Sequence, residues 1–396
     1  MKIQCQVINQ TGADELEVDE NLRLWPCSYV NSENTRIKGA WQLASPELGG
    51  VDNFLSKFPK TWNSLKHHSW EEIIDHPIFA VHFNEEHWND PEQCSAVCKR
   101  ECTTGKSFID VRRTPRLDDV AIDHQRLIAK EDRGYRGDQQ LTGLYAKENV
   151  AHKKEKLGSW KDIPTIDFGI TSYCNAGCSG CSRTNNDTRK AYEWLKLKHV
   201  DADNLIKYIF DAHQFFPGLR NIKFCGDRGD PMMHPRIEFL IDTLCNTLCK
   251  DNKHATRNIN LKINTNGSLR NPDFYKKIAD YSNMVLTWSI DGFEETNHIY
   301  RHGCDFDNIW NNFTTFCKTG GGGNANWDFI VFKHNWHEIP RAKEIAKKFE
   351  INSLDFKIVR QGVHRGLHGL PIVESIDDND IEKVKKLINE DTLPNT

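Results

Sequence analysis

The alternation of short apolar runs with amphipathic segments, which begins at Pro164, most constrains how this chain can fold. Such alternation favours a parallel sheet whose strands are joined by right-handed helical crossovers. Six strand–helix units make three-quarters of an eightfold barrel, so the sequence predicts an α/β fold, a partial (βα)6 TIM-type barrel. The expected strands are 166–171, 221–225, 258–264, 284–290, 328–333 and 353–359, and the expected helices are 201–216, 235–250, 271–281, 305–318, 337–349 and 378–390.

Three cysteines, Cys174, Cys178 and Cys181, directly follow the first expected strand. This position places them at the carboxyl ends of the strands, where chemistry on barrels gathers. A structural zinc site needs a fourth ligand nearby, and the loop supplies no histidine or fourth cysteine after Cys181. Three thiolates on a [4Fe–4S] cube leave one iron open to a ligand, and this fits the loop better.

The CxxxCxxC spacing at the end of a first barrel strand resembles the radical S-adenosylmethionine superfamily. Further motifs similar to those of this family fall at the later strand ends, in the family's order, so chance is a poor explanation. The resemblance covers about residues 164–360. The motifs are Gly226–Pro231 for "GGEP", Thr265–Gly267 for "TNG", Ser289–Gly292 for "S-x-D-G", Tyr300–Gly303 for "YR-x-G" and Lys333–Asn335 for "K-x-N".

The resemblance implies a [4Fe–4S] cluster on the three cysteines, with S-adenosylmethionine on the open iron. Reductive cleavage would give a 5′-deoxyadenosyl radical that takes a hydrogen atom from a substrate. One position departs from the family, because Gly180 stands where a bulky residue usually packs on adenine, and Tyr173 could replace that contact. The residues expected to bind S-adenosylmethionine are Tyr173, Gly226, Gly229, Asp230, Thr265, Asn266, Ser289, Asp291 and Arg301.

The cysteines near the N-terminus suggest a second cluster. Glu15–Cys27 alternates like a hairpin with a turn near Glu20 and Asn21, and it resembles the hairpin of SPASM and twitch domains. The segment 91–107 resembles the twitch cysteine pattern, although this module precedes the barrel and normally follows it. A zinc site with the same ligands stays open, because four cysteines do not distinguish the metals. The expected ligands of an auxiliary [4Fe–4S] cluster are Cys5, Cys27, Cys94 and Cys98, with Cys102 as a substitute.

These patterns divide the chain into a small cysteine-rich α+β module over 1–109, a charged linker over 110–163 and the barrel with a last helix over 164–396. Thirteen cysteines, an odd number without a secretory signal, favour metal and free thiols over disulfides. The run Gly320–Gly323 is expected to be a flexible turn on the face opposite the site. The cysteines expected to be ordinary thiols are Cys225, Cys245, Cys249, Cys304 and Cys317.

The net charge of −4 gives no general attraction to nucleic acid, and the apolar runs are too short for a membrane span. A cytoplasmic enzyme is therefore expected, reduced by a donor such as flavodoxin or ferredoxin. The resemblance favours a peptide or protein substrate that is oxidised or crosslinked. The alternatives are a twitch-type dehydrogenase of a sugar alcohol or another small molecule, and a zinc-stabilised binding protein without enzymatic activity.

Overall fold

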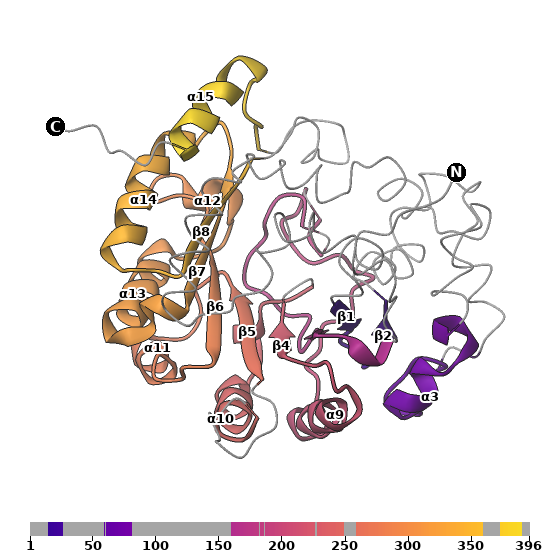
Figure 1. Ribbon diagram of the computed structural model, residues 1–396. Coiled ribbons are helices and arrows are strands. Elements are labelled where there is room, and N and C mark those ends of the chain that lie inside the picture. Colours follow the sequence, from indigo (N-terminus) through magenta and orange to yellow (C-terminus); the bar gives the residue numbers. More distant parts are fainter. Residues whose placement is uncertain are drawn as a thin grey trace, which may run out of the picture.

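A computed structural model describes residues 15–26, 59, 61–80, 160–181, 183–185, 187–225, 228–248, 259–358 and 373–389. Eight strands form one sheet in the order β2-β1-β3-β4-β5-β6-β7-β8 (Figure 1). From β3 to β8 neighbouring strands are parallel and follow the chain order, as the repeated strand–helix pattern predicts. The strands are β1 Glu15–Val18, β2 Leu24–Trp25, β3 Thr165–Phe168, β4 Asn221–Phe224, β5 Asn260–Thr265, β6 Met284–Ser289, β7 Ala325–Val331 and β8 Ser353–Ile358.

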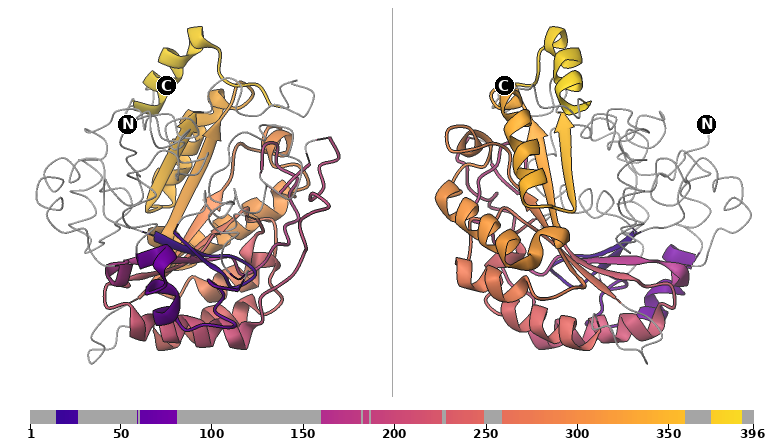
Figure 2. Two further views of the ribbon diagram at one scale, coloured as in Figure 1. Left: turned by 90° about the vertical axis from the view of Figure 1, so that its right-hand side faces the viewer. Right: turned by 60° about the vertical axis from the view of Figure 1, so that its left-hand side comes forward.

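The six expected strands and six expected helices are confirmed, with shifts of a few residues at their ends. Several helices begin where a short polar side chain accepts a hydrogen bond from the first turn, as Asp201, Asn271 and Asp305 do. The helices lie on the outer side of the curved sheet (Figure 2). They are α9 Ala202–Phe215, α10 Ile237–Thr247, α11 Pro272–Ile278, α12 Asn297–Tyr300, α13 Phe306–Phe316, α14 Ile339–Lys348 and α15 Asp378–Asn389, with α3 Trp70–Ile74 before the barrel.

The two faces of the sheet differ in chemistry. Ile166, Phe168 and Ile263 belong to the hydrophobic core that the strands share with the helices. Since successive strand residues point to opposite faces, Asp167 and Lys262 point away from that core. Other residues of this second set are Lys223, Thr287 and Asp328. A polar inner face does not supply packing energy, and it is suited to hold a polar ligand.

The expected hairpin is present, and it extends the barrel sheet. β1 and β2 pair antiparallel, and β1 also pairs in parallel with β3, with Glu15 opposite Thr165. The carboxylate of Asp19 holds the turn, because it accepts hydrogen bonds from the backbone of Asn21 and Arg23 at 2.7 and 3.1 Å. The sequence patterns did not predict this pairing with β3.

Helix α3 also contacts the barrel. Its Trp70 lies edge-on to Phe168 and Phe216, with ring centroids 6.3 and 5.3 Å away, and donates to the carbonyl of Tyr208 at 3.1 Å. Ser69 and Glu72 form a reciprocal cap that begins the helix. Residues 81–159 lie outside the described residues, so the division at 109 and 163 stays a prediction.

Candidate functional site

The loop after β3 carries the three expected cluster cysteines, and all three are free thiols. Cys178 is buried, while Cys174 and Cys181 are partly exposed. Arg183 holds the loop in shape from within. Its guanidinium donates to the carbonyls of Ala176, Ser172 and Arg228, at 3.3, 3.4 and 2.9 Å.

Nitrogen donors from three places point at two of the sulfurs. The backbone N–H of Ala176 and the amide of Asn266 lie 3.3 and 3.8 Å from Cys174 Sγ. The guanidinium of Arg301 lies 3.8 Å from Cys178 Sγ. Burial raises the pKa of Cys178 to about 11, and the charge of Arg301 opposes that rise. Burial likewise raises the pKa of Cys174. N–H donors of this kind stabilise thiolate sulfur once it is bound to metal.

This loop fits an iron–sulfur cluster better than a single ion. Among the described residues, no three His, Cys, Asp or Glu side chains converge on one ion position. A tetrahedral zinc ion needs ligands that meet at one point, whereas a cube spreads its thiolates over separate irons. Soft thiolates with N–H donors around them are also the ligand set that such clusters prefer.

The β4 loop approaches the cysteine loop at Gly229. A Cβ atom there would stand 2.2 Å from the Thr171 carbonyl oxygen and 2.7 Å from that of Tyr173, so only glycine fits. The next residue, Asp230, donates its backbone N–H to the Tyr173 carbonyl at 2.8 Å. The β3 and β4 loops are therefore in direct backbone contact.

The buried carboxylate of Asp230 joins the β4 and β5 loops. It accepts hydrogen bonds from Thr265 Oγ1 at 3.0 Å, from the Asn266 backbone at 2.8 Å and from the Met232 backbone at 2.9 Å. Burial raises its pKa, and these bonds oppose the rise. Its oxygens are thus occupied by the protein, and the carboxylate supports the loops around the cysteines.

Asp291 is the corresponding brace after β6. Its fully buried carboxylate accepts from Arg301 Nε and from the Ile330 backbone, and its carbonyl accepts from Asn335 Nδ2 at 2.7 Å. Burial raises the pKa of Asp291, and the charge of Arg301 opposes the rise. Asp291 therefore fixes the guanidinium that faces Cys178.

The structure gathers most of the residues expected to bind S-adenosylmethionine around the cysteine loop, in two groups. Asp230, Thr265 and Asp291 hold neighbouring loops together. Tyr173, Ser289 and Arg301 retain partly exposed side chains, and the Tyr173 ring stacks on His199 at 4.5 Å. Gly226 lies outside the described residues, as do Cys5, Cys27, Cys94, Cys98 and Cys102.

Gly180 departs from the family pattern for a backbone reason. Its φ of 72° lies in the left-handed region, where a side chain is strained. A bulky residue is therefore disfavoured at this position. Of the cysteines expected to be ordinary thiols, Cys245, Cys304 and Cys317 are buried and Cys225 is partly exposed, while Cys249 lies outside the described residues.

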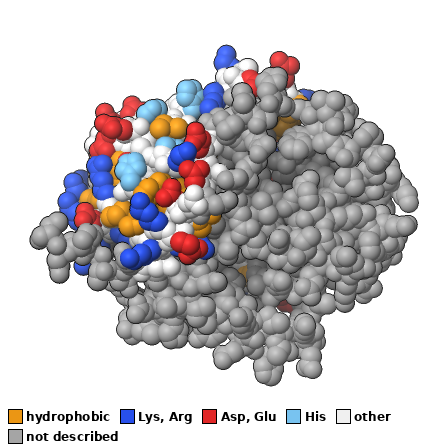
Figure 3. Space-filling model, turned by 90° about the horizontal axis from the view of Figure 1, so that it is seen from above, with side chains coloured by type: hydrophobic (Ala, Val, Ile, Leu, Met, Phe, Trp, Pro, Cys, Tyr) orange, Lys and Arg blue, Asp and Glu red, His pale blue; other side chains and the backbone are white. Residues whose placement is uncertain are grey.

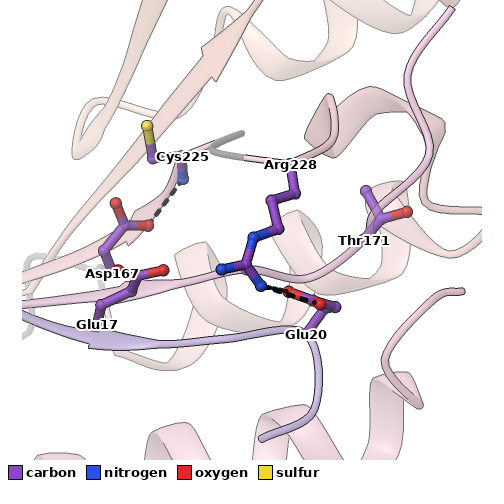
Figure 4. A pocket seen from close by; sticks show the side chains of 7 residues that line it. Glu17, Glu20, Asp167, Thr171, Cys225 and Arg228 are labelled. Carbon is purple, nitrogen blue, oxygen red and sulfur yellow. Dashed lines mark hydrogen bonds and ion pairs between the residues drawn. The ribbon is translucent and has the colours of Figure 1, made fainter. Parts of the chain in front are cut away.

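Sequence reasoning missed a small charged pocket beside the loop (Figure 4). Arg228 pairs there with Glu20 of the hairpin turn at 3.3 Å, and both side chains are buried. Glu17 and Asp167 stand side by side on β1 and β3. The sequence feature that could have indicated this pocket is Asp167, a charged residue inside the short strand β3. The lining residues are Glu17, Glu20, Asp167, Gly169, Thr171, Cys225 and Arg228.

The surface seen from above mixes basic, acidic and histidine side chains over its described part (Figure 3). The described part of this surface therefore shows no field of one sign. Within the described ranges, no helix combines the length and the apolarity needed to cross a bilayer.

Comparison with known families gives one match, in which residues 169–345 fit the model described as the Radical SAM superfamily. A cofactor-modifying protein for the tungsten-containing aldehyde ferredoxin oxidoreductase of Pyrococcus furiosus is 28% identical over 122 residues, 31% of this chain and 29% of that protein. An S-adenosylmethionine-dependent nucleotide dehydratase of Danio rerio is 26% identical over 173 residues, 40% of this chain and 43% of that protein. The chain thus spans less than half the length of these curated relatives.

Among solved structures, SuiB of Streptococcus suis bound to S-adenosylmethionine has a TM-score of 0.44 and 14% identity, and covers 67% of this chain and 56% of that one. The protein anSMEcpe with bound AdoMet has a TM-score of 0.41 and 17% identity, and covers 57% of this chain and 59% of that one.

Proposed function

Because residues 169–345 are a domain of the radical SAM superfamily, whose cofactors are a [4Fe–4S] cluster and S-adenosylmethionine, we propose that Cys174, Cys178 and Cys181 hold that cluster in this chain. The proposed activity is reductive cleavage of S-adenosylmethionine followed by hydrogen abstraction from a substrate. One observation carries the proposal: three free thiols share one loop at the strand ends, and Asn266 and Arg301 direct N–H groups at two of them.

When bound, the two cofactors supply an electron and a carbon radical able to take hydrogen from an unactivated C–H bond. The protein's part is to hold and shield them. Gly229 lets the β4 backbone reach the cysteine loop, and the carboxylates of Asp230 and Asp291 fix the loops around it. Tyr173, Ser289 and Arg301 are the proposed side-chain contacts of S-adenosylmethionine. All three are partly exposed, Tyr173 directly precedes Cys174, Arg301 lies beside Cys178, and Ser289 ends strand β6.

We further propose a polar substrate, and a peptide or protein in particular, that is oxidised or crosslinked. The polar inner face, with Asp167, Lys223 and Lys262, would suit polar groups better than apolar ones. The resemblance of residues 15–27 and 91–107 to SPASM and twitch modules supports the peptide class and an auxiliary cluster on Cys5, Cys27, Cys94 and Cys98, or Cys102. The same polar inner face keeps a small polar molecule, such as a sugar alcohol, as the second candidate.

Anaerobic reconstitution tests the cofactor part. We expect about four irons per chain, or about eight with the auxiliary cluster, and 5′-deoxyadenosine after reduction with dithionite. Cys174→Ala should abolish cleavage, while Cys245→Ala, a buried thiol on α10, should retain it. Stoichiometric zinc without cleavage would instead favour the binding protein.

A second measurement addresses the substrate. Cell extract is separated by size into a peptide and protein fraction and a small-molecule fraction, and each is added to the reduced enzyme. We expect the first fraction to increase 5′-deoxyadenosine above the background without substrate. Stimulation by the small-molecule fraction alone would replace the peptide proposal with the dehydrogenase.

A further inference from the structure

The segment from Arg183 to His199, here called the basic cover, packs on the cysteine loop through its described residues, which are all but residue 186. In the left panel of Figure 2 it runs down the right-hand side as a magenta loop outside the sheet and helices. Lys198 donates its backbone N–H to Ser172 Oγ at 2.8 Å, and its carbonyl accepts from the Ser172 backbone at 3.0 Å. Arg189 donates to Ser179 Oγ, and Tyr173 stacks on His199. The cover is thus in direct contact with the loop that carries the thiols.

The basic cover is positive in a chain that is negative overall. It holds five cations against the two anions Asp187 and Glu193, whereas the whole chain has a net charge of −4. The cations are Arg183, Arg189, Lys190, Lys196 and Lys198. The residues before the barrel bring both signs of charge near Lys198. Burial lowers the pKa of Lys198, the charges of Glu20 and Asp19 oppose this shift, and those of Lys66 and Arg23 add to it.

Four of the five cations of the basic cover fall into two sets, and the fifth, Lys198, donates its ammonium N–H to Asn21 Oδ1 of the hairpin turn. Arg183 and Arg189 turn inward and hold the cysteine loop. Lys190 and Lys196 are exposed, and close to them in the chain are Leu197, which is 42% exposed, and the stacked, partly exposed rings of Tyr192 and Trp194. Exposed apolar and aromatic side chains interspersed with charged ones are a composition found at protein-binding surfaces.

We propose that the basic cover is the docking surface for an acidic one-electron carrier protein that reduces the cluster. This inference rests on the proposed function, because only a cluster at Cys174, Cys178 and Cys181 needs that electron. The carrier is oxidised as one electron passes to the cluster, and no covalent bond changes. A positive surface steers an acidic partner into encounter, and such redox contacts are small and transient. The described part of the face in Figure 3 mixes both signs of charge and offers no comparable steering.

The test compares two reductants on the reconstituted full chain. Reduced flavodoxin serves as the acidic carrier and dithionite as a small reductant, and the loss of cluster absorbance gives each rate. The variant Lys190→Glu/Lys196→Glu reverses two exposed charges of the cover. The matched control Lys276→Glu/Lys347→Glu makes the same change on α11 and α14 of the helical layer.

At low ionic strength we expect the cover variant to slow reduction by flavodoxin about tenfold. Salt should slow the unaltered protein and leave the variant nearly unchanged, because screening removes the steering. Dithionite should reduce the unaltered protein, the cover variant and the control alike, and the control should keep its flavodoxin rate.

Three outcomes would overturn the docking surface. The flavodoxin rate could be the same in the cover variant and the control. The cover variant could also lose its dithionite rate to the same extent, which would mean that Lys190 and Lys196 support the cluster loop and do not act through a docked carrier. Salt-sensitive binding of an RNA oligonucleotide that the cover variant alone loses, with flavodoxin unaffected, would assign the surface to nucleic acid. The dithionite arm with the unaltered protein reports on the proposed function by itself, so its failure is distinguishable from failure of the docking surface.

Discussion

The cysteine loop after β3 and the turn between α13 and β7 make an instructive pair. Each buries a cysteine, with Cys178 6% exposed and Cys317 8% exposed, and each contains glycines. Burial raises the pKa of both thiols, to about 11 for Cys178 and about 12 for Cys317. The difference is that Arg301 lies beside Cys178, with its charge opposing the rise. Burial alone therefore leaves an inert thiol, as at Cys317. The donors beside Cys178 are what make that thiol a candidate cluster ligand.

The largest expected difference between the two regions is in iron binding. Cys178→Ala should lose about four irons per chain after reconstitution, because two remaining thiolates hold a cube poorly. Cys317→Ala should keep all of its iron. Iron analysis and visible absorbance measure both. Equal iron in the two variants would mean that Cys178 is only a packed thiol.

Glycine substitution gives the next difference. Gly229→Ala should lower the free energy of unfolding by about 3 kcal/mol, because its new methyl meets backbone oxygens of the cysteine loop. Gly323→Ala should change it by less than about 0.5 kcal/mol, because a Cβ there meets no atom within 4 Å. Urea unfolding of both variants gives the two values. A mild Gly229→Ala variant would show that the cysteine loop can move away.

These regions also show what the sequence could and could not predict. The strand–helix units were predictable because each has its own apolar period, and several of the helices also have a capping residue, as Asp201 illustrates. The pairing of β1 with β3 was not, because the alternation of the hairpin is satisfied whether it stands alone or joins the sheet.

The candidate site, too, was predictable only in part. Motif spacing located the three cysteines and the loops around them. It did not show that Asp230 and Asp291 are occupied by protein donors, because a motif specifies a residue type and not its partners. Nor did it show the pairing of Arg228 with Glu20, which depends on the position of the hairpin.

Removing the guanidinium tests directly what separates Cys178 from Cys317. Arg301→Gln should lower the free energy of unfolding by about 3 kcal/mol, since it leaves the buried Asp291 without its charge partner. It should also lower the midpoint potential of the reconstituted cluster, because a positive charge and an N–H donor near sulfur are lost.

Arg301→Lys controls for charge alone. The Arg301→Lys variant should recover part of the midpoint potential that Arg301→Gln loses. It should recover a smaller part of the lost free energy of unfolding, because an ammonium does not reproduce the forked guanidinium geometry. Denaturant unfolding and a redox titration followed by electron paramagnetic resonance measure the two effects. An unchanged midpoint potential in Arg301→Gln would mean that the guanidinium beside Cys178 does not influence the cluster, and that Cys178 does not differ from Cys317 in this respect.

The smallest expected effect is on the free energy of unfolding at acid pH, where neither Cys178 nor Cys317 titrates. His334 stacks on Phe332, with ring centroids 5.2 Å apart, and burial lowers its pKa to about 4, with His337 and His298 adding to the shift. The unfolded chain binds this proton near pH 6.5, so the unfolded state takes up more protons between about pH 6.5 and 4. The contribution of His334 to stability is therefore lost as the pH falls through this range.

Asp230 and Asp291, whose pKa values are raised, change stability in the opposite direction, so the comparison must be with a variant. The unfolding free energy of His334→Phe should decline less between pH 6.5 and 4.5 than that of the unaltered protein, and parallel curves would mean that His334 is protonated in the folded state.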